Sequence, residues 1–488
     1  VVAIGGLITA YNYIKRVVMR IKELQPDIPI VTGGGYFSAI PWDIMELLPW
    51  IDYGLIGECY LSFPELLKAI DNNEVPEHVN GTVYRKNDGI EFAPPRPVIR
   101  DLDWLPFPAY RYAPLHKYFP HSGILMSKEA MKAKKRLDFN FSLSCPFVCR
   151  YCFDLGITAD PIYEKKSNGR IEPITGRPTK RSIVRQHSPQ YIGHIIEHVR
   201  KEYLDIPYNY IHKSEEDHDC DETGCEPLGI GYPCDFLAWT DENIVAHDAQ
   251  TGFTWLKEIE HELEKRNMIP ECVLKGEPHN YKRCNSMHFG WTAHASLAKR
   301  DTLETMKRMG FVYLDYGIEH FHPGLLTKMG KGATAERNKY AIALTIEVGL
   351  TPIPNQITMF PDESWETIRV MVDAWEETGI SSVPFFATGY PGCEWYTTHK
   401  DFILEQYGNS LETYICDLED ATKMTALLTR NFTPVEAVGI QQLLGQVAKT
   451  RDFANVRRLF CLSERQWRKA RSLSEDGGEF AKYLEKHI

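Results

Sequence analysis

Apolar residues recur along this chain with two alternating periods, those of short buried strands and of amphipathic helices. The apolar run VVAIGG precedes Ile14, Val17, Val18 and Ile21, which share one helical face, and IPIVTGGG is the next apolar run. DYGLIG is a third such run, and SFPELLKAI begins another helix with Pro64 in its first turn. Strands that alternate with helices in this way predict a parallel sheet.

Three glycines, Gly33, Gly34 and Gly35, follow the second predicted strand directly. Glycine lets a ligand approach the backbone, and open α/β sheets bind ligands at the carboxyl ends of their strands. A tight turn explains the same three residues equally well. Both interpretations stay open at this edge of the sheet.

Prolines interrupt the pattern after this region. The segment from Pro94 to Pro114, PPRPVIRDLDWLPFPAYRYAP, carries six of them. Proline fixes φ and interrupts both regular structures. We therefore expect 94–135 to be a linker that follows a first domain over 1–93.

Six strand-then-helix units follow the linker. The predicted strands are LDFNFSL (137–143), DFLAW (235–239), MHFGW (287–291), FVYLDYGIE (311–319), PIPNQITMF (352–360) and VPFFAT (383–388). Helices with one apolar face separate them, as at Ile192, Ile195, Ile196 and Val199. Six such repeats predict a partial (βα)6 barrel of TIM type over 136–395, with its chemistry at the carboxyl ends of the strands.

Two insertions and a polar tail complete the chain. The insertions, 160–187 and 207–233, are candidates for a substrate lid, because long irregular loops in compact domains tend to be functional or disordered. Residues 396–488 are predicted to be a helical region without an assignable motif. The predicted fold class is α/β, with a partial Rossmann-like domain, the barrel and this helical C-terminal region.

Composition limits the partners. The chain of 488 residues has a net charge of −11 and a pI near 5.9, which argues against nucleic acid as a partner. No apolar run is long enough to span a membrane. The chain opens on VVAIGG without an initiator Met or a signal peptide, so we expect an N-terminally truncated, cytoplasmic protein. Twelve cysteines in such a chain favour metal binding or catalysis over disulfides.

Three of these cysteines, Cys145, Cys149 and Cys152, fall within eight residues, CPFVCRYC, directly after a predicted strand. Three thiolates on one loop suit a compact metal centre. Zinc normally takes a fourth ligand and paired C-x2-C knuckles, whereas an iron–sulfur cluster with three protein ligands leaves one iron open to substrate. A zinc site and buried inert thiols remain the alternatives.

The C-x3-C-x2-C spacing, with Tyr151 before the last cysteine and Phe153 after it, resembles the cluster loop of the radical S-adenosylmethionine (SAM) superfamily. This resemblance implies a partial (βα)6 barrel and a [4Fe-4S] cluster held by Cys145, Cys149 and Cys152. It also implies that the open iron chelates SAM, whose cleavage gives a 5′-deoxyadenosyl radical. An electron donor such as flavodoxin or ferredoxin is implied as a partner, with a small molecule or biosynthetic intermediate as substrate.

The first 115 residues carry a second resemblance. GGLITAYNY, IVTGGGYFSAIP, IDYGLIGECYLSF and IRDLDWLPFPAYR resemble, in order and spacing, the C-terminal part of a cobalamin-binding domain joined to its radical SAM barrel. The resemblance implies that cobalamin contacts the following residues: Thr9, Gly33, Gly34, Gly35, Gly57 and Glu58. For Thr9, a helix cap is the competing interpretation.

The same resemblance implies SAM contacts inside the barrel. They fall on Tyr151, Phe153, Asp241, Glu242, His294 and Glu319. Asp241 and Glu242 would hold the SAM amine, for which a solvated, acidic helix start is the alternative. Glu319 would contact the ribose or methionine portion, and a barrel-rim carboxylate without a ligand is its alternative.

Two positions depart from the family pattern. Relatives often read Ala-Arg where this chain has Ala293-His294, and Gly-Phe-Pro-Gly-Glu where it has MFPDE at 359–363. A titratable ring replaces a guanidinium at the first position, and His294 is equally open to a structural role. The adenine-side wall is therefore expected to differ in shape.

Five further cysteines lie in or near the second insertion: Cys220, Cys225, Cys234, Cys272 and Cys284. Their irregular spacing favours separate thiols over an extra cluster or a zinc site. The resemblance as a whole implies a cobalamin-dependent methyltransferase that acts on an unactivated carbon or a phosphorus. The alternatives are a cyclase or ring-rearranging enzyme of the same architecture, and a non-catalytic cobalamin- or metal-binding protein.

Overall fold

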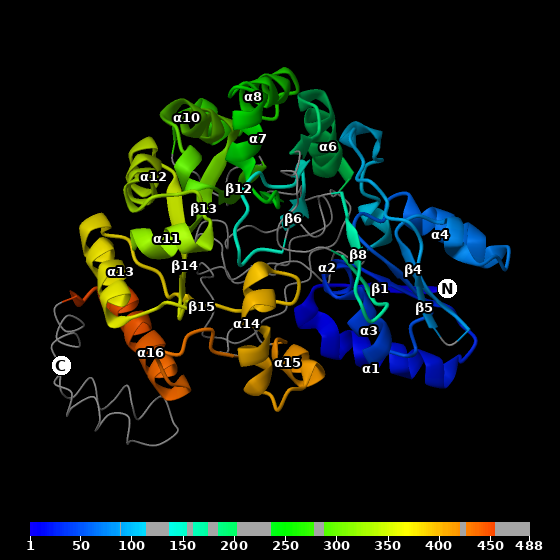
Figure 1. The fold of residues 1–488 in the computed structure, drawn as a ribbon. Helices are drawn as coiled ribbons and strands as arrows, with labels where there is room; N and C mark the ends of the chain where they lie inside the picture. Colours follow the sequence, from blue (N-terminus) through cyan, green and yellow to red (C-terminus); the bar gives the residue numbers. More distant parts are fainter. Residues whose placement is uncertain are drawn as a thin grey trace, which may run out of the picture.

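The computed structural model describes residues 1–87, 89–113, 136–153, 160–173, 184–202, 236–277, 287–419 and 426–453. The two largest sheets, one from residues 2–92 and one from residues 136–386, lie side by side, and the C-terminal helices pack beside them (Figure 1). The α/β fold class predicted from the sequence is confirmed. The predicted domain boundaries remain predictions.

The first sheet has five strands in the order β1-β2-β3-β4-β5. Strands β1 (Val2–Gly5), β2 (Ile30–Gly33) and β3 (Tyr53–Leu55) are parallel, as predicted. Helices α1 (Tyr11–Leu24), α2 (Gly35–Ala39), α3 (Pro41–Leu47) and α4 (Ser62–Asp71) connect or follow them. The apolar face of α1 is buried at Ile14 and Val18, which explains why this sequence forms a helix against the sheet.

The last two strands of this sheet, β4 (Thr82–Lys86) and β5 (Gly89–Phe92), form an antiparallel hairpin that the sequence analysis did not predict. Asn87 follows β4 with a φ of 48°, a conformation that asparagine tolerates better than most residues. A short strand pair around an Asn-x-Gly turn carries a weaker periodic signal than the βα units before it.

The second sheet is a curled half-barrel of six parallel strands. In spatial order they are β6 (Arg136–Phe139), β11 (Phe236–Trp239), β12 (His288–Ala293), β13 (Phe311–Glu319), β14 (Thr351–Thr358) and β15 (Phe385–Phe386). The outer helices in Figure 1 are α6 (Pro189–Glu202), α8 (Trp255–Lys265), α10 (Arg300–Met309), α12 (Ala335–Val348) and α13 (Trp365–Thr378). Shorter helices α7 (Ile244–Gln250), α9 (Glu271–Leu274) and α11 (Pro323–Met329) complete this half. The six predicted repeats are therefore confirmed.

The first predicted barrel strand, 137–143, is divided in two. Strand β6 ends at Phe139, and β7 (Ser142–Leu143) pairs with β10 (Arg185–Gln186) outside the barrel. Between them, the Asn140 amide donates to the Thr240 carbonyl (2.7 Å), and the Thr240 hydroxyl donates to the Asn140 side-chain oxygen (2.7 Å). These bonds hold the chain where it leaves the barrel, so the residues after it can form a separate loop.

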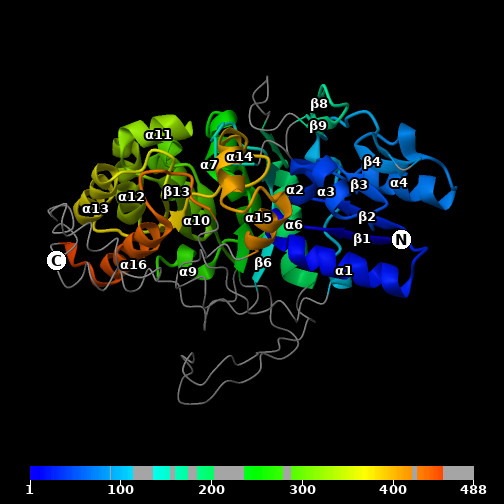
Figure 2. The same ribbon diagram turned by 60° about the horizontal axis from the view of Figure 1, so that its bottom comes forward.

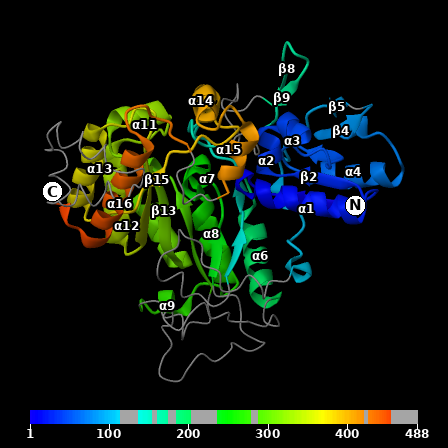
Figure 3. The ribbon, with the colours of Figure 1, turned by 90° about the horizontal axis from the view of Figure 1, so that it is seen from below.

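Helices α14 (Glu394–Glu405) and α15 (Leu411–Asp417) lie between the two sheets (Figure 3), and α16 (Pro434–Thr450) packs beside α13 (Figure 2). Glu412 of α15 accepts hydrogen bonds from the Tyr11 hydroxyl (2.9 Å) and the Lys15 ammonium (2.6 Å) of α1. Apolar side chains of the first sheet's helices share one core with α11, α14 and α15. The two halves are therefore joined by a common apolar core.

Of the first insertion, 160–187, the structure describes 160–173, with the hairpin β8 (Tyr163–Lys165) and β9 (Ile171–Pro173), and 184–187, with β10. The second insertion lies outside the described residues. Within the described part of the chain, no helix has both the length and the apolar character needed to cross a membrane.

Candidate cofactor site

The three predicted cluster ligands follow β7 on one loop. Cys145 and Cys149 are half-buried and Cys152 is exposed. Across the described ranges, no three His, Cys, Asp or Glu side chains converge on a preformed metal site. The three thiols are therefore close in sequence and accessible, but they would have to turn toward a common centre to bind a cluster.

The backbone of this loop is docked on two neighbouring segments. The Arg150 N–H donates to the Met329 carbonyl (2.9 Å), and the Trp395 N–H donates to the Arg150 carbonyl (3.0 Å). Gly330 has a φ of 68°, and a Cβ there would lie 2.9 Å from the Val148 carbonyl oxygen. Only glycine permits this close approach.

Behind the loop lies a buried charged network. The Lys331 ammonium is 2.9 Å from Glu319 Oε1 and 3.1 Å from the Tyr151 hydroxyl, which donates to the same Glu319 oxygen (2.9 Å). Burial disfavours the ammonium, but Glu319 and Cys149 more than offset this and raise the pKa of Lys331. Burial raises the pKa of Cys149, and Lys331 opposes that shift. One cation therefore sits where three thiolates and a carboxylate would gather.

Glu319 itself is held in a strained conformation. Its φ is 60°, and the register between β13 and β14 shifts at this residue. A non-glycine residue in this region costs of order 1–3 kcal/mol and persists only where its surroundings hold it. Here the bonds to Lys331 and Tyr151 do so, and they turn the carboxylate toward the cysteine loop.

His294 is packed against the same loop. Its ring stacks on Phe147 with centroids 3.7 Å apart, and Nε2 donates to the Lys331 carbonyl (2.9 Å). Nδ1 accepts from the Ser296 hydroxyl (2.7 Å). Burial lowers the pKa of His294 to about 3, so the ring is neutral. Both nitrogens are occupied by protein partners, which favours the structural interpretation of this residue.

The Asp241–Asn243 segment follows β11 and lies beside the root of the loop. Asp241 is fully buried and accepts hydrogen bonds from the Ser142 hydroxyl and the Phe141 N–H. Burial raises its pKa to about 7. Glu242 is half-buried and close enough to raise the pKa of Tyr60 in the first half of the chain. Asn243 caps α7 and directs its amide toward Cys145 Sγ (3.9 Å).

At the carboxyl edge of the first sheet, Gly33 ends β2 and is followed by Gly34 and Gly35, and we call this the glycine edge. It is a site of close backbone contact. Gly34 has a φ of 87°, and a Cβ there would lie 2.9 Å from the Gly6 carbonyl oxygen. Gly33 has ordinary contacts, and Gly35 begins α2. Thr9 lies half-buried in the 3-10 turn η1 (Ile8–Ala10) after β1. The tight-turn interpretation therefore explains Gly34, and the ligand roles of these residues remain predictions.

Gly57 and Glu58 follow β3 at the same edge. Gly57 has a φ of 76°, and its N–H donates to the Ser38 hydroxyl (2.9 Å). The Glu58 carboxylate forms a two-pronged ion pair with Arg185 and accepts from the Ile99 N–H (3.2 Å). The Glu58 carboxylate is thus already occupied by a contact between the first sheet and the β7–β10 strand pair.

The cysteine loop and the glycine edge meet at Gly392, in the loop after β15. A Cβ on Gly392, whose φ is 98°, would lie 2.4 Å from the Phe153 ring and 2.9 Å from Ala39 Cβ. Phe153 follows the last cysteine, and Ala39 ends the short helix after the three glycines. The residue after the last cysteine and the end of α2, which begins at Gly35, therefore lie on either side of Gly392.

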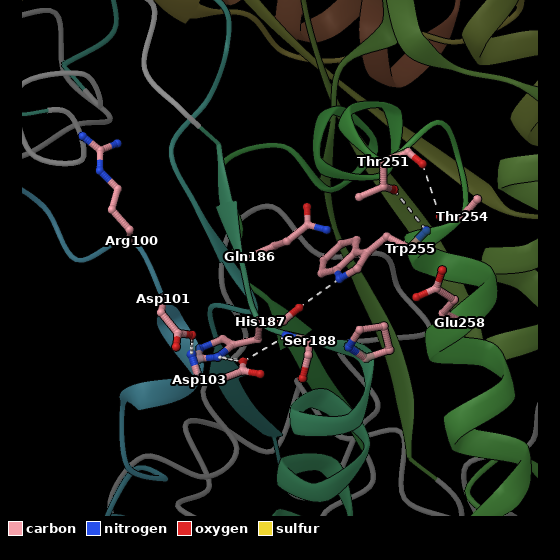
Figure 4. Close-up of a pocket in the computed structure, with 11 residues that line it drawn as sticks. Arg100, Asp101, Asp103, Gln186, His187, Ser188, Thr251, Thr254, Trp255 and Glu258 are labelled. Atoms are coloured by element: carbon pink, nitrogen blue, oxygen red, sulfur yellow. Dashed lines mark hydrogen bonds and ion pairs between the residues drawn. The ribbon is translucent and has the colours of Figure 1, made fainter.

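A cavity of about 320 Å³ lies elsewhere, between the linker and the starts of α6 and α8 (Figure 4). Asp103 there accepts from the Ser188 N–H (2.9 Å) and pairs with His187 (3.1 Å). None of the predicted site residues lines it. Of the five extra cysteines, Cys272 is buried with Sγ 3.5 Å from His288 Nε2, and the other four lie outside the described residues.

Sequence reasoning missed two residues that organise this region, Lys331 and Arg185. Lys331 stands between Gly330 and Gly332, and a Cβ on Gly332 would lie 3.0 Å from the Phe147 ring. A lysine between two glycines was the available signal. Arg185 gave no signal in the sequence, because its partners Glu58 and Ser144 are 127 and 41 residues away along the chain.

Comparisons with known proteins agree with this geometry. Residues 251–374 match the model of the Radical SAM superfamily. The chain is 24% identical over 377 residues to an uncharacterized methyltransferase, PH0819, of Pyrococcus horikoshii, covering 76% of this chain and 63% of that protein. It is 28% identical over 155 residues to an anaerobic magnesium-protoporphyrin IX monomethyl ester cyclase of Synechocystis sp., covering 32% of this chain and 29% of that protein.

Two solved structures have a similar fold. TsrM of Kitasatospora setae, a radical SAM methyltransferase with cobalamin and a [4Fe-4S] cluster bound, matches with a TM-score of 0.53 at 16% identity, over 82% of this chain and 64% of that one. The cobalamin-dependent radical SAM enzyme OxsB with aqua-cobalamin bound matches with a TM-score of 0.55 at 12% identity. The match covers 100% of this chain and 62% of that one. The chain thus spans less than two thirds of the length of these proteins. It carries a radical SAM domain and has the fold of cobalamin-dependent radical SAM enzymes.

Proposed function

We propose that this chain is a cobalamin-dependent radical SAM enzyme that transfers a methyl group to an unactivated carbon or a phosphorus of a small molecule. The observation that carries the proposal is the contact at Gly392, where the loop of three cysteines meets the glycine edge of the first sheet. Such a junction brings two cofactors within reach of one substrate. The relative named as a methyltransferase supports the choice of reaction.

The cysteine loop fits an iron–sulfur cluster by the chemistry of its donors. Cys145, Cys149 and Cys152 supply three thiols, and Lys331 supplies a buried positive charge beside them. A cluster with three thiolates carries negative charge that this ammonium would offset. Glu242 and Glu319 would then provide carboxylates at two strand ends for the amine and hydroxyl groups of SAM, whereas the Asp241 carboxylate is buried against Ser142 and Phe141.

The edge of the first sheet fits a large planar cofactor. Leu7 is 65% exposed and Tyr60 is 46% exposed, although both follow strands of the sheet at its carboxyl edge. Exposed apolar side chains beside a glycine-rich backbone suit cobalamin, which combines an apolar face with an amide-rich rim. Thr9 and Gly33 to Gly35 would lie along its tail.

When bound, the cluster and SAM would supply radical chemistry, and methylcobalamin would supply the methyl group. The protein's own residues hold these groups in place and exclude water. The side chains of Tyr151, Glu319 and Lys331 are hydrogen-bonded to one another behind the cysteine loop. Phe153 and Gly392 close the junction beside it. An electron donor such as flavodoxin or ferredoxin would reduce the cluster.

The test begins with protein purified and reconstituted without air. We expect iron and sulfide near four each per chain, bound cobalamin, and formation of 5′-deoxyadenosine when SAM and a low-potential reductant are added. Substrate incubated with SAM that carries a deuterated methyl group should gain that label. Zinc in place of iron, or no deoxyadenosine, would refute the proposal.

A second candidate is a cyclase of the same architecture. The similarity to the magnesium-protoporphyrin ester cyclase supports it, and that similarity covers 32% of this chain. It would use the same cofactor sites without methyl transfer. Product mass separates the two reactions: deoxyadenosine formation with an altered product that lacks the deuterated methyl group would support the cyclase.

A further inference from the structure

A buried ion pair joins the edge of the first sheet to the β7–β10 strand pair at the root of the cysteine loop. Arg185 of β10 donates through Nη1 to Glu58 Oε2 (2.9 Å) and through Nη2 to Glu58 Oε1. The two side chains are only 2% and 8% exposed. Removing one partner of such a pair leaves an uncompensated buried charge, so the two residues depend on each other.

The same guanidinium reaches the residue before the first cysteine. Arg185 Nη2 is 3.4 Å from the Ser144 hydroxyl, and Nη1 donates to the Ile99 carbonyl (2.7 Å). Arg185 is also opposite Leu143 in the β7–β10 pair. One side chain therefore touches the edge of the first sheet, the linker and the start of the cysteine loop.

Ser144 is the strained element in this arrangement. Its φ is 80°, in the region that favours glycine, and it is fully buried. Such a conformation persists only where neighbouring groups hold it, and it sets the direction in which the following residue, Cys145, leaves the strand. The hydroxyl contact with Arg185 and the pairing of the preceding residue, Leu143, with β10 are among the contacts that hold Ser144.

We infer that Arg185, anchored by Glu58, is a positioning residue that holds Ser144 in its left-handed conformation and so fixes the cysteine loop relative to the first sheet. This role deepens the proposed function, because it would keep the cluster aligned with the cobalamin edge. It does not require either cofactor to be present, since all of its contacts are within the chain.

The experiment measures amide hydrogen exchange in the metal-free chain, over peptides that cover 141–153 and 54–60. Amide exchange reports local opening of the two segments that the Arg185–Glu58 ion pair joins. We expect Arg185→Met and Glu58→Gln each to speed exchange in both peptides by about tenfold or more. Arg170→Met is the matched control, because Arg170 also pairs with a carboxylate of the first half, Asp43 (2.7 Å), but away from the loop.

A second variant tests the strain. Glycine adopts a positive φ without penalty, so Ser144→Gly combined with Arg185→Met should restore slow exchange over 145–153 at least in part. In reconstituted protein, Arg185→Met should also change the electron paramagnetic resonance spectrum that the reduced cluster gives with SAM, and the double variant should return it toward wild type.

Three results would overturn the inference. They are exchange within twofold of wild type in Arg185→Met, an equal effect of Arg170→Met on the loop, and no recovery in the double variant. A wild-type chain that binds no cluster would refute the proposed function instead, while the exchange measurements would still test Arg185.

Discussion

The cysteine loop and the edge of the first sheet meet at Gly392, but they are stabilised in opposite ways. The loop is backed by charged side chains, Lys331 and Glu319, that are almost fully buried. The edge is built from backbone contacts, such as that between Gly34 and Gly6, and leaves Leu7 and Tyr60 exposed. A charged cluster needs a fixed counter-charge behind it, whereas a large cofactor needs exposed surface and an open backbone.

Removing a cluster ligand should have the largest effect. Cys149→Ala leaves two thiols on the loop, and we expect the iron content and SAM cleavage to fall at least about a hundredfold, since even outer-shell changes cost 10–100-fold. Iron and sulfide assays and deoxyadenosine detection measure this. Cys416→Ala, a half-buried cysteine on α15, is the control and should keep both. Equal losses in the two variants would contradict a cluster at the loop.

Removing the buried positive charge of Lys331 should have the second-largest effect. Lys331→Met leaves Glu319 buried without its cation, so we expect a loss of about 3–5 kcal/mol in the free energy of unfolding. Lys328→Met is the control, because the pair between Lys328 and Asp362 is exposed and should contribute about 0–1 kcal/mol. Denaturant unfolding of the two variants measures the difference, and similar values would show that the network does not stabilise the loop.

A pair of glycine substitutions should separate the two regions. Gly34→Ala and Gly330→Ala each introduce a Cβ at a positive φ, 2.9 Å from a carbonyl oxygen, at a cost of about 1–3 kcal/mol. We expect the first to weaken cobalamin binding and spare the cluster, and the second to do the reverse. Cobalamin titration and iron analysis of both proteins test this.

The control for that pair is Gly379→Ala. Gly379 ends α13 with a φ of 67°, and a Cβ there would meet nothing within 4 Å. Backbone strain alone, about 1 kcal/mol, should therefore leave both cofactors bound. If either of the other two variants lost both cofactors together, the regions would not be independent.

The smallest expected effect is a pH-dependent change in stability at Asp315, inside the barrel. Asp315 of β13 is buried and accepts from the Asn355 amide, and burial with the nearby Glu319 raises its pKa to about 7. The folded state therefore binds a proton more tightly than the unfolded state, and this contribution to stability is lost as pH rises from about 4 to above 7. Asp315→Asn should be more stable than wild type at pH 8, and the difference in the free energy of unfolding should vanish near pH 4.

Thermal or denaturant unfolding across this pH range measures that difference. Asp27→Asn, an exposed position, is the control and should match wild type at every pH. A constant advantage of Asp315→Asn at all pH values would mean that packing, and not ionisation, separates the two proteins.

Local patterns of the sequence determined the repeating architecture. The strand over 311–319 has the bounds that its apolar run predicted, because that run is nearly continuous. The spacing of Cys145, Cys149 and Cys152 likewise placed the candidate cluster loop. The antiparallel hairpin at 82–92 was missed because its strands are short, although the sequence from one strand to the next contains Asp88-Gly89, a pair typical of hairpin turns.

Tertiary structure alone decided which of the predicted residues lie open and which are already engaged. Glu58 and His294 read as ligand positions along the chain, yet Glu58 is bound by Arg185 and both His294 ring nitrogens have protein partners. Lys331 gains its importance only where β13 brings Glu319 beside Tyr151, which is 168 residues away. Periodicity and spacing are properties of neighbours in sequence, whereas charge pairing, burial and strain depend on groups that meet only when the chain folds.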